Sequence, residues 1–199
     1  MRIAAGFAAG AILSLSLSSA SFAAPRTETA VLAGGCFWGM ELVFEHVKGV
    51  ANVVSGYAGG SAQHAHYEDS DSGHAEAVRV TYDPSKISYQ QLLQIYFTVA
   101  HNPTQVDRQG PDTGRSYRSA IFPQSPQQAA IARAMIARVN AAHIYKAPVA
   151  TRIEYGGFWP AEAYHQDFAR KHPFYPYIVV NDRPKVGVLK SKYPSLFKA

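Results

Sequence analysis

Short runs of apolar residues bounded by Gly, Pro or Asp recur along the chain. The clearest is AEAVRVTY at 75–82, where apolar and polar side chains alternate until Asp83-Pro84 ends the pattern. Alternation with a period of two is typical of a β-strand. On this basis, strands are predicted at residues 27–32, 53–57, 75–82, 119–122 and 151–155.

Apolar residues spaced three or four positions apart predict amphipathic helices. Helices are predicted at residues 37–47, 88–99, 125–142 and 160–171. Ser88 and Ser125 are favourable N-cap residues, and Pro126 suits the first turn of a helix. The segments 61–73 and 101–115 are polar and irregular, and the Pro-, Tyr- and Lys-rich tail from Pro173 is expected to wrap the surface.

The order of these elements predicts the fold class. Strands and helices follow one another without strict alternation, which favours an α+β architecture. We expect a small mixed sheet with helices packed on one face.

The first residues predict export. Met1-Arg2 is followed by an apolar stretch and a small-residue segment around Ser21-Phe22-Ala23. This pattern is typical of a secretory signal peptide over 1–23 and is too short for a good membrane span, although an uncleaved anchor or a disordered tail are alternatives. The mature protein is therefore expected to be periplasmic or secreted. The remaining 24–199, about 176 residues, fit a single domain.

Charge and apolar patterning argue against other partner classes. The formal net charge is +5, or +4 without Arg2, and the basic residues are scattered rather than clustered. Such a distribution supports solubility and does not predict nucleic-acid binding. No later apolar run is long enough to cross a membrane and no heptad pattern appears, so a monomer is expected.

Cys36 is the only cysteine in the chain, and it lies between a predicted strand and a predicted helix in GGCFWG. A single thiol rules out an internal disulfide and a Cys-rich metal site. In an exported protein it is either a reactive group or an inert small apolar residue. At a helix start, free backbone N–H groups and the helix dipole would stabilise its thiolate, which is the nucleophilic form.

Other polar residues leave alternatives open. Glu76 is either desolvated, which would raise its pKa and make it a proton donor, or directed to solvent. Asp112 either forms a turn or orients a hydroxyl such as that of Tyr117. A metal site is not predicted, because the histidines at 64, 66 and 74 lack a further ligand at a suitable spacing. The histidines at 101, 143, 165 and 172 are candidate partners for a Cys–His nucleophile.

Three motifs together resemble one family, the peptide-methionine (S)-S-oxide reductases (MsrA family). They are GCFWG at 35–39, GHAEAV at 73–78 and DTGRSYRS at 112–119, and the resemblance extends from about Thr27 to Lys171. It implies a ferredoxin-like α+β two-layer sandwich with long coil segments, forming one reductase domain over 24–199. It also implies no metal or organic cofactor.

The resemblance implies a role for each of seven residues. Cys36 would attack the sulfur of methionine sulfoxide, free or in proteins, and become a sulfenic acid. Glu76 would supply the proton, and the pair is expected to share one proton because a charged Glu76 repels the thiolate. The remaining roles are hydrogen bonding to the oxygen for Tyr67 and Tyr117, support of this network for Asp112, and binding of the S-methyl group for Phe37 and Trp38.

The chain departs from the family pattern in its tail. Many members carry further cysteines near the C-terminus, but residues 173–199 contain none. An external dithiol reductant, such as a thioredoxin-like protein, is therefore expected to restore Cys36. Smaller departures are Arg115-Ser116 before Tyr117 and Asn102 in a His-Asp-Pro-like position. Alternative functions are a thiol hydrolase, a thiol peroxidase and a secreted binding module.

Overall fold

The computed structural model describes residues 27–67 and 73–199, so the predicted signal peptide over 1–23 lies outside the described residues. The strands are β1 (Glu28–Gly34), β2 (Val50–Ala58), β3 (Ala75–Tyr82), β4 (Arg108–Gln109), β5 (Asp112–Thr113), β6 (Ser119–Phe122), β7 (Arg152–Ile153) and β8 (Phe158–Pro160). The helices are α1 (Phe37–Glu45), α2 (Tyr89–Ile95), α3 (Pro126–Ala141), α4 (Phe168–Lys171) and α5 (Arg183–Lys192). Short helical turns complete the description: η1 (Ala62–His64), η3 (Tyr96–Ala100), η4 (Arg115–Tyr117) and η5 (Ile178–Asp182).

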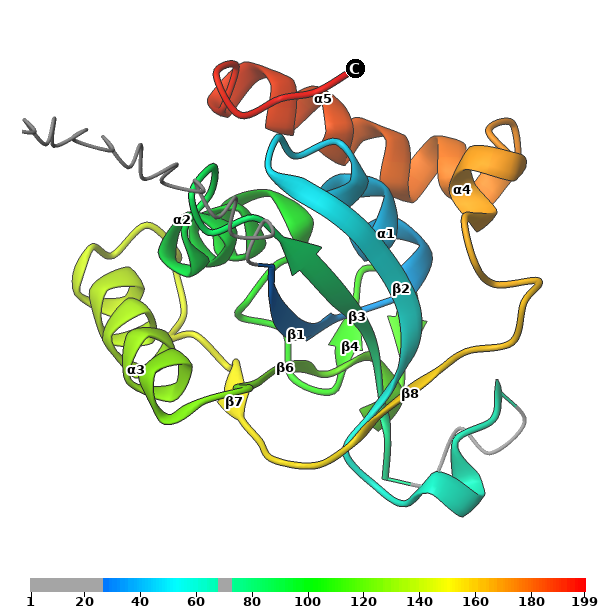
Figure 1. Cartoon of the computed structure of the whole chain (residues 1–199), viewed down its shortest axis with the longest axis horizontal. Coiled ribbons are helices and arrows are strands. Elements are labelled where there is room, and N and C mark those ends of the chain that lie inside the picture. Colours follow the sequence, from blue (N-terminus) through cyan, green and yellow to red (C-terminus); the bar gives the residue numbers. More distant parts are fainter. Residues whose placement is uncertain (1–26, 68–72) are drawn as a thin grey trace, which may run out of the picture.

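Six strands form one mixed sheet in the order β7-β6-β1-β3-β2-β8. Neighbouring strands are antiparallel except β6 and β7, which are parallel. β4 and β5 form a separate two-stranded ribbon. The predicted α+β class, a small mixed sheet with helices, is confirmed (Figure 1).

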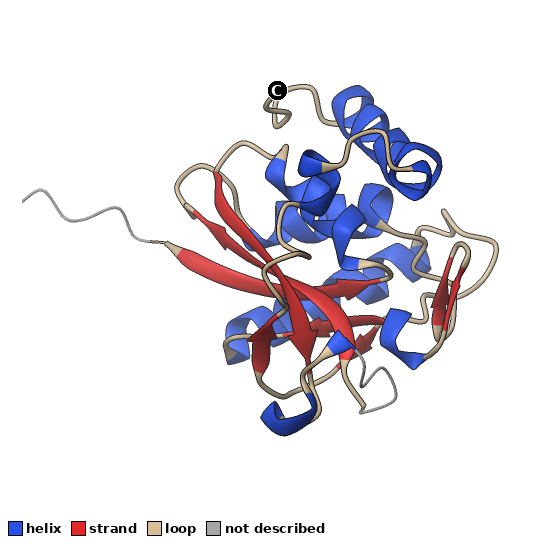
Figure 2. Ribbon diagram, turned by 90° about the vertical axis from the view of Figure 1, so that its right-hand side faces the viewer, coloured by secondary structure: helices blue, strands red, loops and turns tan. Residues whose placement is uncertain are grey.

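The two faces of the sheet are covered differently. Leu32, Val78 and Val80 belong to a large apolar cluster with residues of α1, α2, α3 and α5. Ala33, Ala77 and their neighbours form a second, smaller cluster on the opposite face. Figure 2 shows the strands as a twisted layer with α-helices gathered against it. Because both faces are buried, a polar residue on the middle strands cannot reach solvent simply by alternating.

One edge of the sheet gathers the segments that the motifs singled out. Ala33 near the end of β1 pairs with Ala77 near the start of β3, and Gly34 pairs with Ser119 at the start of β6. In an antiparallel sheet the end of one strand lies beside the start of the next. The β1–α1 turn, the start of β3 with Glu76, and the segment before β6 therefore meet at this edge.

The predicted helix over 160–171 is wrong except for its last turn, α4. Residues before it run as β8 and then as turns, because main-chain partners on β2 hold them in place. The amide of Gln166 accepts from the N–H of Ser55 at 3.0 Å and donates to its carbonyl at 2.9 Å, and the N–H of Ala161 donates to the same carbonyl at 2.9 Å. Asp167 then adopts a left-handed conformation with φ 57°.

The tail also differs from its prediction. Beyond Pro173 it folds into η5 and α5, which pack on α1 (Figure 1). Its apolar pattern is weak because only Ile178 and Leu189 are buried apolar residues of these two elements. No helix among residues 27–67 and 73–199 is long and apolar enough to span a membrane.

Candidate active site

A cavity of about 240 Å³ lies at the edge of the sheet where the motif segments meet. All seven residues that the resemblance implied line it, together with two tyrosines of the tail. The lining residues are Cys36, Phe37, Trp38, Tyr67, Glu76, Asp112, Tyr117, Tyr175 and Tyr177. Two other cavities, of about 360 and 350 Å³, are larger but contain no thiol. We identify the smaller cavity as the site because it alone joins a thiol to a desolvated acid.

Cys36 is the N-cap of α1, as its position after a Gly-Gly pair suggested. Gly35 makes the turn possible, since its φ of +92° belongs to the region that favours glycine. A side chain at this position would also meet Gln109, whose Cβ would lie 2.5 Å from an added Cβ. The turn therefore places the sulfur between the end of β1 and the first turn of α1.

The charge of Cys36 differs from the expectation. Burial, followed by the negative charges of Glu76 and Asp182, raises the pKa of the Cys36 thiol well above 9, while a hydrogen bond from the N–H of Trp38 lowers it. The helix start does favour the thiolate, as predicted, but the other effects outweigh it. Cys36 is therefore a protonated thiol in the free protein at neutral pH.

Glu76 is desolvated, which decides between the two alternatives that the sequence left open. It lies on β3 with 5% of its surface exposed, and its Oε2 accepts a hydrogen bond of 3.0 Å from the N–H of Phe37. Burial raises the pKa of Glu76 to about 8, although the bond from Phe37 opposes the shift and the charge of Asp112 adds to it. Glu76 and Cys36 therefore each hold a proton at neutral pH, rather than sharing one as expected.

Hydroxyl groups surround the cavity. Tyr117 lies on η4, and burial followed by the charge of Glu76 raises its pKa, so its hydroxyl is a donor throughout the physiological range. Asp112 accepts a hydrogen bond from Tyr177, not from Tyr117 as considered above. The phenol of Tyr67 is half-exposed at the mouth of the cavity. The site thus offers several neutral O–H donors to one small ligand.

Aromatic rings form the apolar wall. Phe37 is buried and belongs to the main core as well as to the cavity. Trp38 stacks on Phe168, with ring centroids 3.8 Å apart and planes at 10°, and meets Tyr175 and Tyr177 edge-on. Because these rings fix Trp38 from several sides, it forms a rigid surface for an apolar group.

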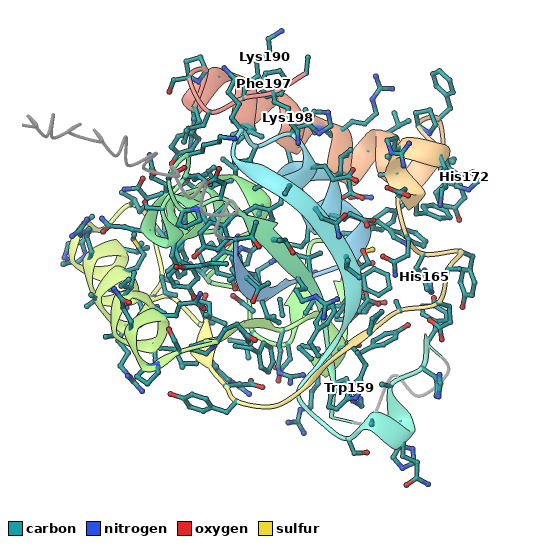
Figure 3. The ribbon with its side chains drawn as sticks, in the orientation of Figure 1. Trp159, His165, His172, Lys190, Phe197 and Lys198 are labelled. Carbon is teal, nitrogen blue, oxygen red and sulfur yellow. The ribbon has the colours of Figure 1, made fainter. Side chains whose placement is uncertain are left out.

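His165 contacts both Phe37 and Trp38 and so supports the apolar wall. It lies on the connection between β8 and α4, six residues after Trp159 of β8 (Figure 3). The indole N–H of Trp38 donates to its Nδ1 at 3.1 Å, and the ring of Phe37 lies 4.9 Å from it. Indole nitrogen can only donate, so Nδ1 must accept and His165 is neutral. Burial lowers its pKa, which favours the same state.

The other histidines do not assemble the alternative sites. His101 is buried and hydrogen-bonds Ser119 at 2.7 Å, so neither it nor His165 is directed to Cys36 as a base. Among residues 27–67 and 73–199, the group of side chains close enough to hold a cation is Glu41, Glu45 and Asp167, and none of the three histidines at 64, 66 and 74 belongs to it.

The tail tyrosines and His165 could not be assigned from sequence. Tyr175 and Tyr177 lie in a segment predicted to wrap the surface, and their only signal was the unusual number of aromatic residues there. His165 was one of four equivalent candidates. Their roles depend on how η5 and α4 pack on α1, which no local pattern reports.

Comparison with known proteins gives one family. A family model described as "Peptide methionine sulfoxide reductase" matches residues 28–195. "Peptide methionine sulfoxide reductase MsrA 2" of Mesorhizobium japonicum is 56% identical over 179 residues, 88% of this chain and 92% of that protein. An MsrA of Thermus thermophilus is 43% identical over 175 residues, 86% of this chain and 98% of that protein.

Solved structures agree with this result. Methionine sulfoxide reductase A of Corynebacterium diphtheriae is 33% identical with a TM-score of 0.65, over 77% of this chain and 80% of that one. Mxr1 of Saccharomyces cerevisiae in its reduced form is 28% identical with a TM-score of 0.65, over 75% of this chain and 88% of that one. The fold and the sequence thus lead to the same group of proteins.

Proposed function

The chain belongs to the peptide methionine sulfoxide reductase family, and from this premise we propose that it reduces the S-epimer of methionine sulfoxide through a sulfenic acid on Cys36. The observation that supports the proposal most directly is that Cys36 and Glu76 line the same cavity. A protonated thiol and a carboxyl group with a pKa of about 8 line one small cavity, and Phe37 connects them through its backbone.

The first step transfers oxygen from substrate to enzyme. Cys36 attacks the sulfoxide sulfur while Glu76 gives its proton to the sulfoxide oxygen, which makes that oxygen a better leaving group. The oxygen ends on the Cys36 sulfur as a sulfenic acid, methionine leaves, and the proton lost by Cys36 returns to Glu76. Sulfur of the substrate is reduced by two electrons, and Cys36 is oxidised by two.

The other cavity residues hold the substrate. Tyr67 and Tyr117 donate hydrogen bonds to the sulfoxide oxygen, and Asp112 keeps the hydroxyl network oriented through Tyr177. Phe37 and Trp38 receive the S-methyl group.

The same arrangement accounts for the choice of one epimer. A sulfoxide sulfur carries three different substituents and a lone pair, so it is chiral. The cavity fixes a nucleophile, an acid and an apolar wall relative to one another, and a single epimer presents sulfur, oxygen and methyl to all three at once. We assign the S-epimer from the resemblance of the three motifs.

Cys36 must be restored by another molecule. The chain has one cysteine, so a resolving thiol has to come from outside. An external thiol attacks the sulfenic acid, releases water and forms a mixed disulfide, and a second thiol then frees Cys36. A thioredoxin-like protein, which supplies both thiols, is the proposed reductant. No prosthetic group enters this cycle.

The proposal is tested with both epimers of a methionine sulfoxide peptide and excess dithiothreitol. We expect loss of the S-epimer alone and no turnover by Cys36→Ser. A thiol peroxidase would instead consume peroxide and spare both epimers, and a binding module would be unaffected by the substitution. Consumption of the R-epimer, or activity of Cys36→Ser, would contradict the proposal.

We further propose that residues 1–23 direct export and that the enzyme acts outside the cytoplasm, in the periplasm or after secretion. The support is the charged, apolar and small-residue order of that segment. Mass spectrometry of the protein purified from expressing cells is expected to find a chain that begins near residue 24; an intact first residue would contradict it.

A further inference from the structure

Asp182, the last residue of η5, is a fully buried carboxylate that the proposed reaction does not use. Its Oδ1 accepts a hydrogen bond from Nζ of Lys185 at 3.0 Å, and the two groups form an ion pair. Its Oδ2 has no hydrogen-bond partner among residues 27–67 and 73–199. A buried carboxylate with one unpaired oxygen is unfavourable for folding, so its presence beside an active site calls for a functional reason.

The pair lies directly against the first turn of α1. Gly39, in that turn, leaves the space that the pair fills. A Cβ added to Gly39 would lie 2.1 Å from Oδ1 of Asp182 and 2.8 Å from Nζ of Lys185. Glycine is less favourable than alanine in a helix. The missing side chain therefore serves to bring a carboxylate and an ammonium group close to the backbone that follows Cys36.

The charge of Asp182 acts on the nucleophile. It is one of the groups that raise the pKa of Cys36, after burial and Glu76. The other charged or titratable groups that face Asp182 are Lys185 on α5, Asp112 on β5, and Tyr177 immediately before η5. Burial raises the pKa of Asp182 itself, and Lys185 opposes this shift.

We propose that Asp182 and Lys185 are positioning residues that act as a charge pair behind Cys36 and set how readily the thiol becomes a thiolate. Lys185 offsets the negative charge of Asp182, so the buried carboxylate holds the start of α1 without fully opposing ionisation of Cys36. The inference rests on the proposed role of Cys36 as the nucleophile.

A charge pair makes a prediction that a purely structural contact does not. Asp182→Asn removes the anion and leaves the ammonium group, so Cys36 ionises at lower pH. Lys185→Met leaves the anion alone, so Cys36 ionises at higher pH. The double variant has neither charge and is expected between the two. Loss of packing alone would move both single variants in the same direction.

Alkylation by iodoacetamide measures this without turnover, and the single cysteine makes the reaction specific to Cys36. Rates are recorded over pH 7–11 for the full chain and each variant. At a pH below the thiol pKa, we expect Asp182→Asn to react about threefold faster or more and Lys185→Met about threefold slower or more, corresponding to shifts of about half a pH unit. A failure of sulfoxide reduction would leave these rates unchanged, so the two proposals fail separately.

Matched variants complete the experiment. Lys86→Met breaks the ion pair with Asp83, also three residues apart at 3.3 Å but exposed, and is expected to leave the alkylation profile unchanged. Lys185→Arg retains the charge and is expected to remain close to wild type, which keeps the test valid if Lys185→Met does not fold. The proposal would be overturned if Asp182→Asn and Lys185→Met changed the alkylation rate in the same direction. It would also be overturned if Lys185→Arg were alkylated as slowly as Lys185→Met.

Discussion

The backbone N–H of Phe37 donates a hydrogen bond of 3.0 Å to Oε2 of Glu76, across 39 positions of sequence. The bond joins the first residue of α1 to the start of β3, so the residue next to the nucleophile also holds the acid. It opposes the effect of burial on the pKa of Glu76, which nevertheless reaches about 8. The geometry thus keeps an acid oriented and protonated beside Cys36.

Glu76→Gln is expected to lower kcat by about 10²- to 10⁴-fold, the usual contribution of general acid catalysis. Glutamine keeps a hydrogen-bond donor but cannot transfer its proton. Activity of the wild type is expected to fall above pH 8, where Glu76 ionises, and this limb should be missing from the pH profile of the variant. Glu28→Gln, at the opposite end of the sheet, is the control. An unchanged rate in Glu76→Gln would remove the acid from the mechanism.

The same substitution should make stability less dependent on pH. Folded Glu76 keeps its proton up to about pH 8, whereas the unfolded chain releases it near the usual value of 4.5. The folded state binds more protons between these values, so the wild type loses stability as the pH rises through them. Between pH 5 and pH 9, the free energy of unfolding of Glu76→Gln should rise relative to that of the wild type by on the order of 4 kcal/mol. Urea unfolding at the two pH values measures it; a constant difference would contradict the desolvated state.

Phe168→Ala is expected to raise KM several-fold while kcat changes little. Phe168 supports the ring of Trp38 by stacking but touches no group that moves a proton. A double-mutant cycle with Trp38→Ala should give a coupling energy of about 0.5–1.5 kcal/mol. Phe197→Ala removes a comparable ring that lies beside His46 near the C-terminus (Figure 3) and should leave KM unchanged. A loss confined to kcat would show that the ring has another role.

Arg118 holds two motif segments together. Its guanidinium donates to the carbonyls of Gly73, His74 and Arg115, and pairs with Glu154 at 2.8 Å. Arg118→Met removes all of these bonds from a side chain that is itself buried, and should lower the free energy of unfolding by about 3–5 kcal/mol.

Two further variants show whether this loss of stability is specific to the buried guanidinium of Arg118. Arg118→Lys should not restore stability, because an ammonium group cannot make the same set of bonds. Arg170→Met breaks an exposed pair with Asp167 and should change stability little. Equal losses in Arg118→Met and Arg170→Met would contradict this role.

The sequence predicted the elements whose patterns are local. β3 begins and ends where the alternation does, and Ser88 caps α2 with Gln91 completing a capping box. The burial of Glu76 could not be predicted in this way, because alternation does not show that Ala75 and Ala77 belong to a second buried cluster on the far face of the sheet. The segment 160–171 resembles a helix in sequence because Ala161, His165 and Ala169 are buried at four-residue intervals, whereas its main chain instead pairs with β2.

The residues of the candidate site also divide into those with a local sequence pattern and those that depend on tertiary packing. Six cavity residues lie in the three short motifs, and Tyr67 lies shortly before the second of them. Tyr175, Tyr177 and Asp182 instead depend on the packing of η5 and α5 on α1. α5 buries only Leu189, so its sequence has little helical periodicity. The tail, which the sequence predicts to wrap the surface, supplies two of the residues that line the cavity.

In the proposed cycle, Cys36 takes the oxygen of methionine sulfoxide and keeps it until an external thiol arrives. One turnover without reductant, followed by mass spectrometry of the peptide that contains Cys36, tests it most directly. We predict one added oxygen on Cys36, one equivalent of methionine, and loss of the added oxygen on addition of dithiothreitol. Methionine formed while Cys36 remains an unmodified thiol would contradict the account.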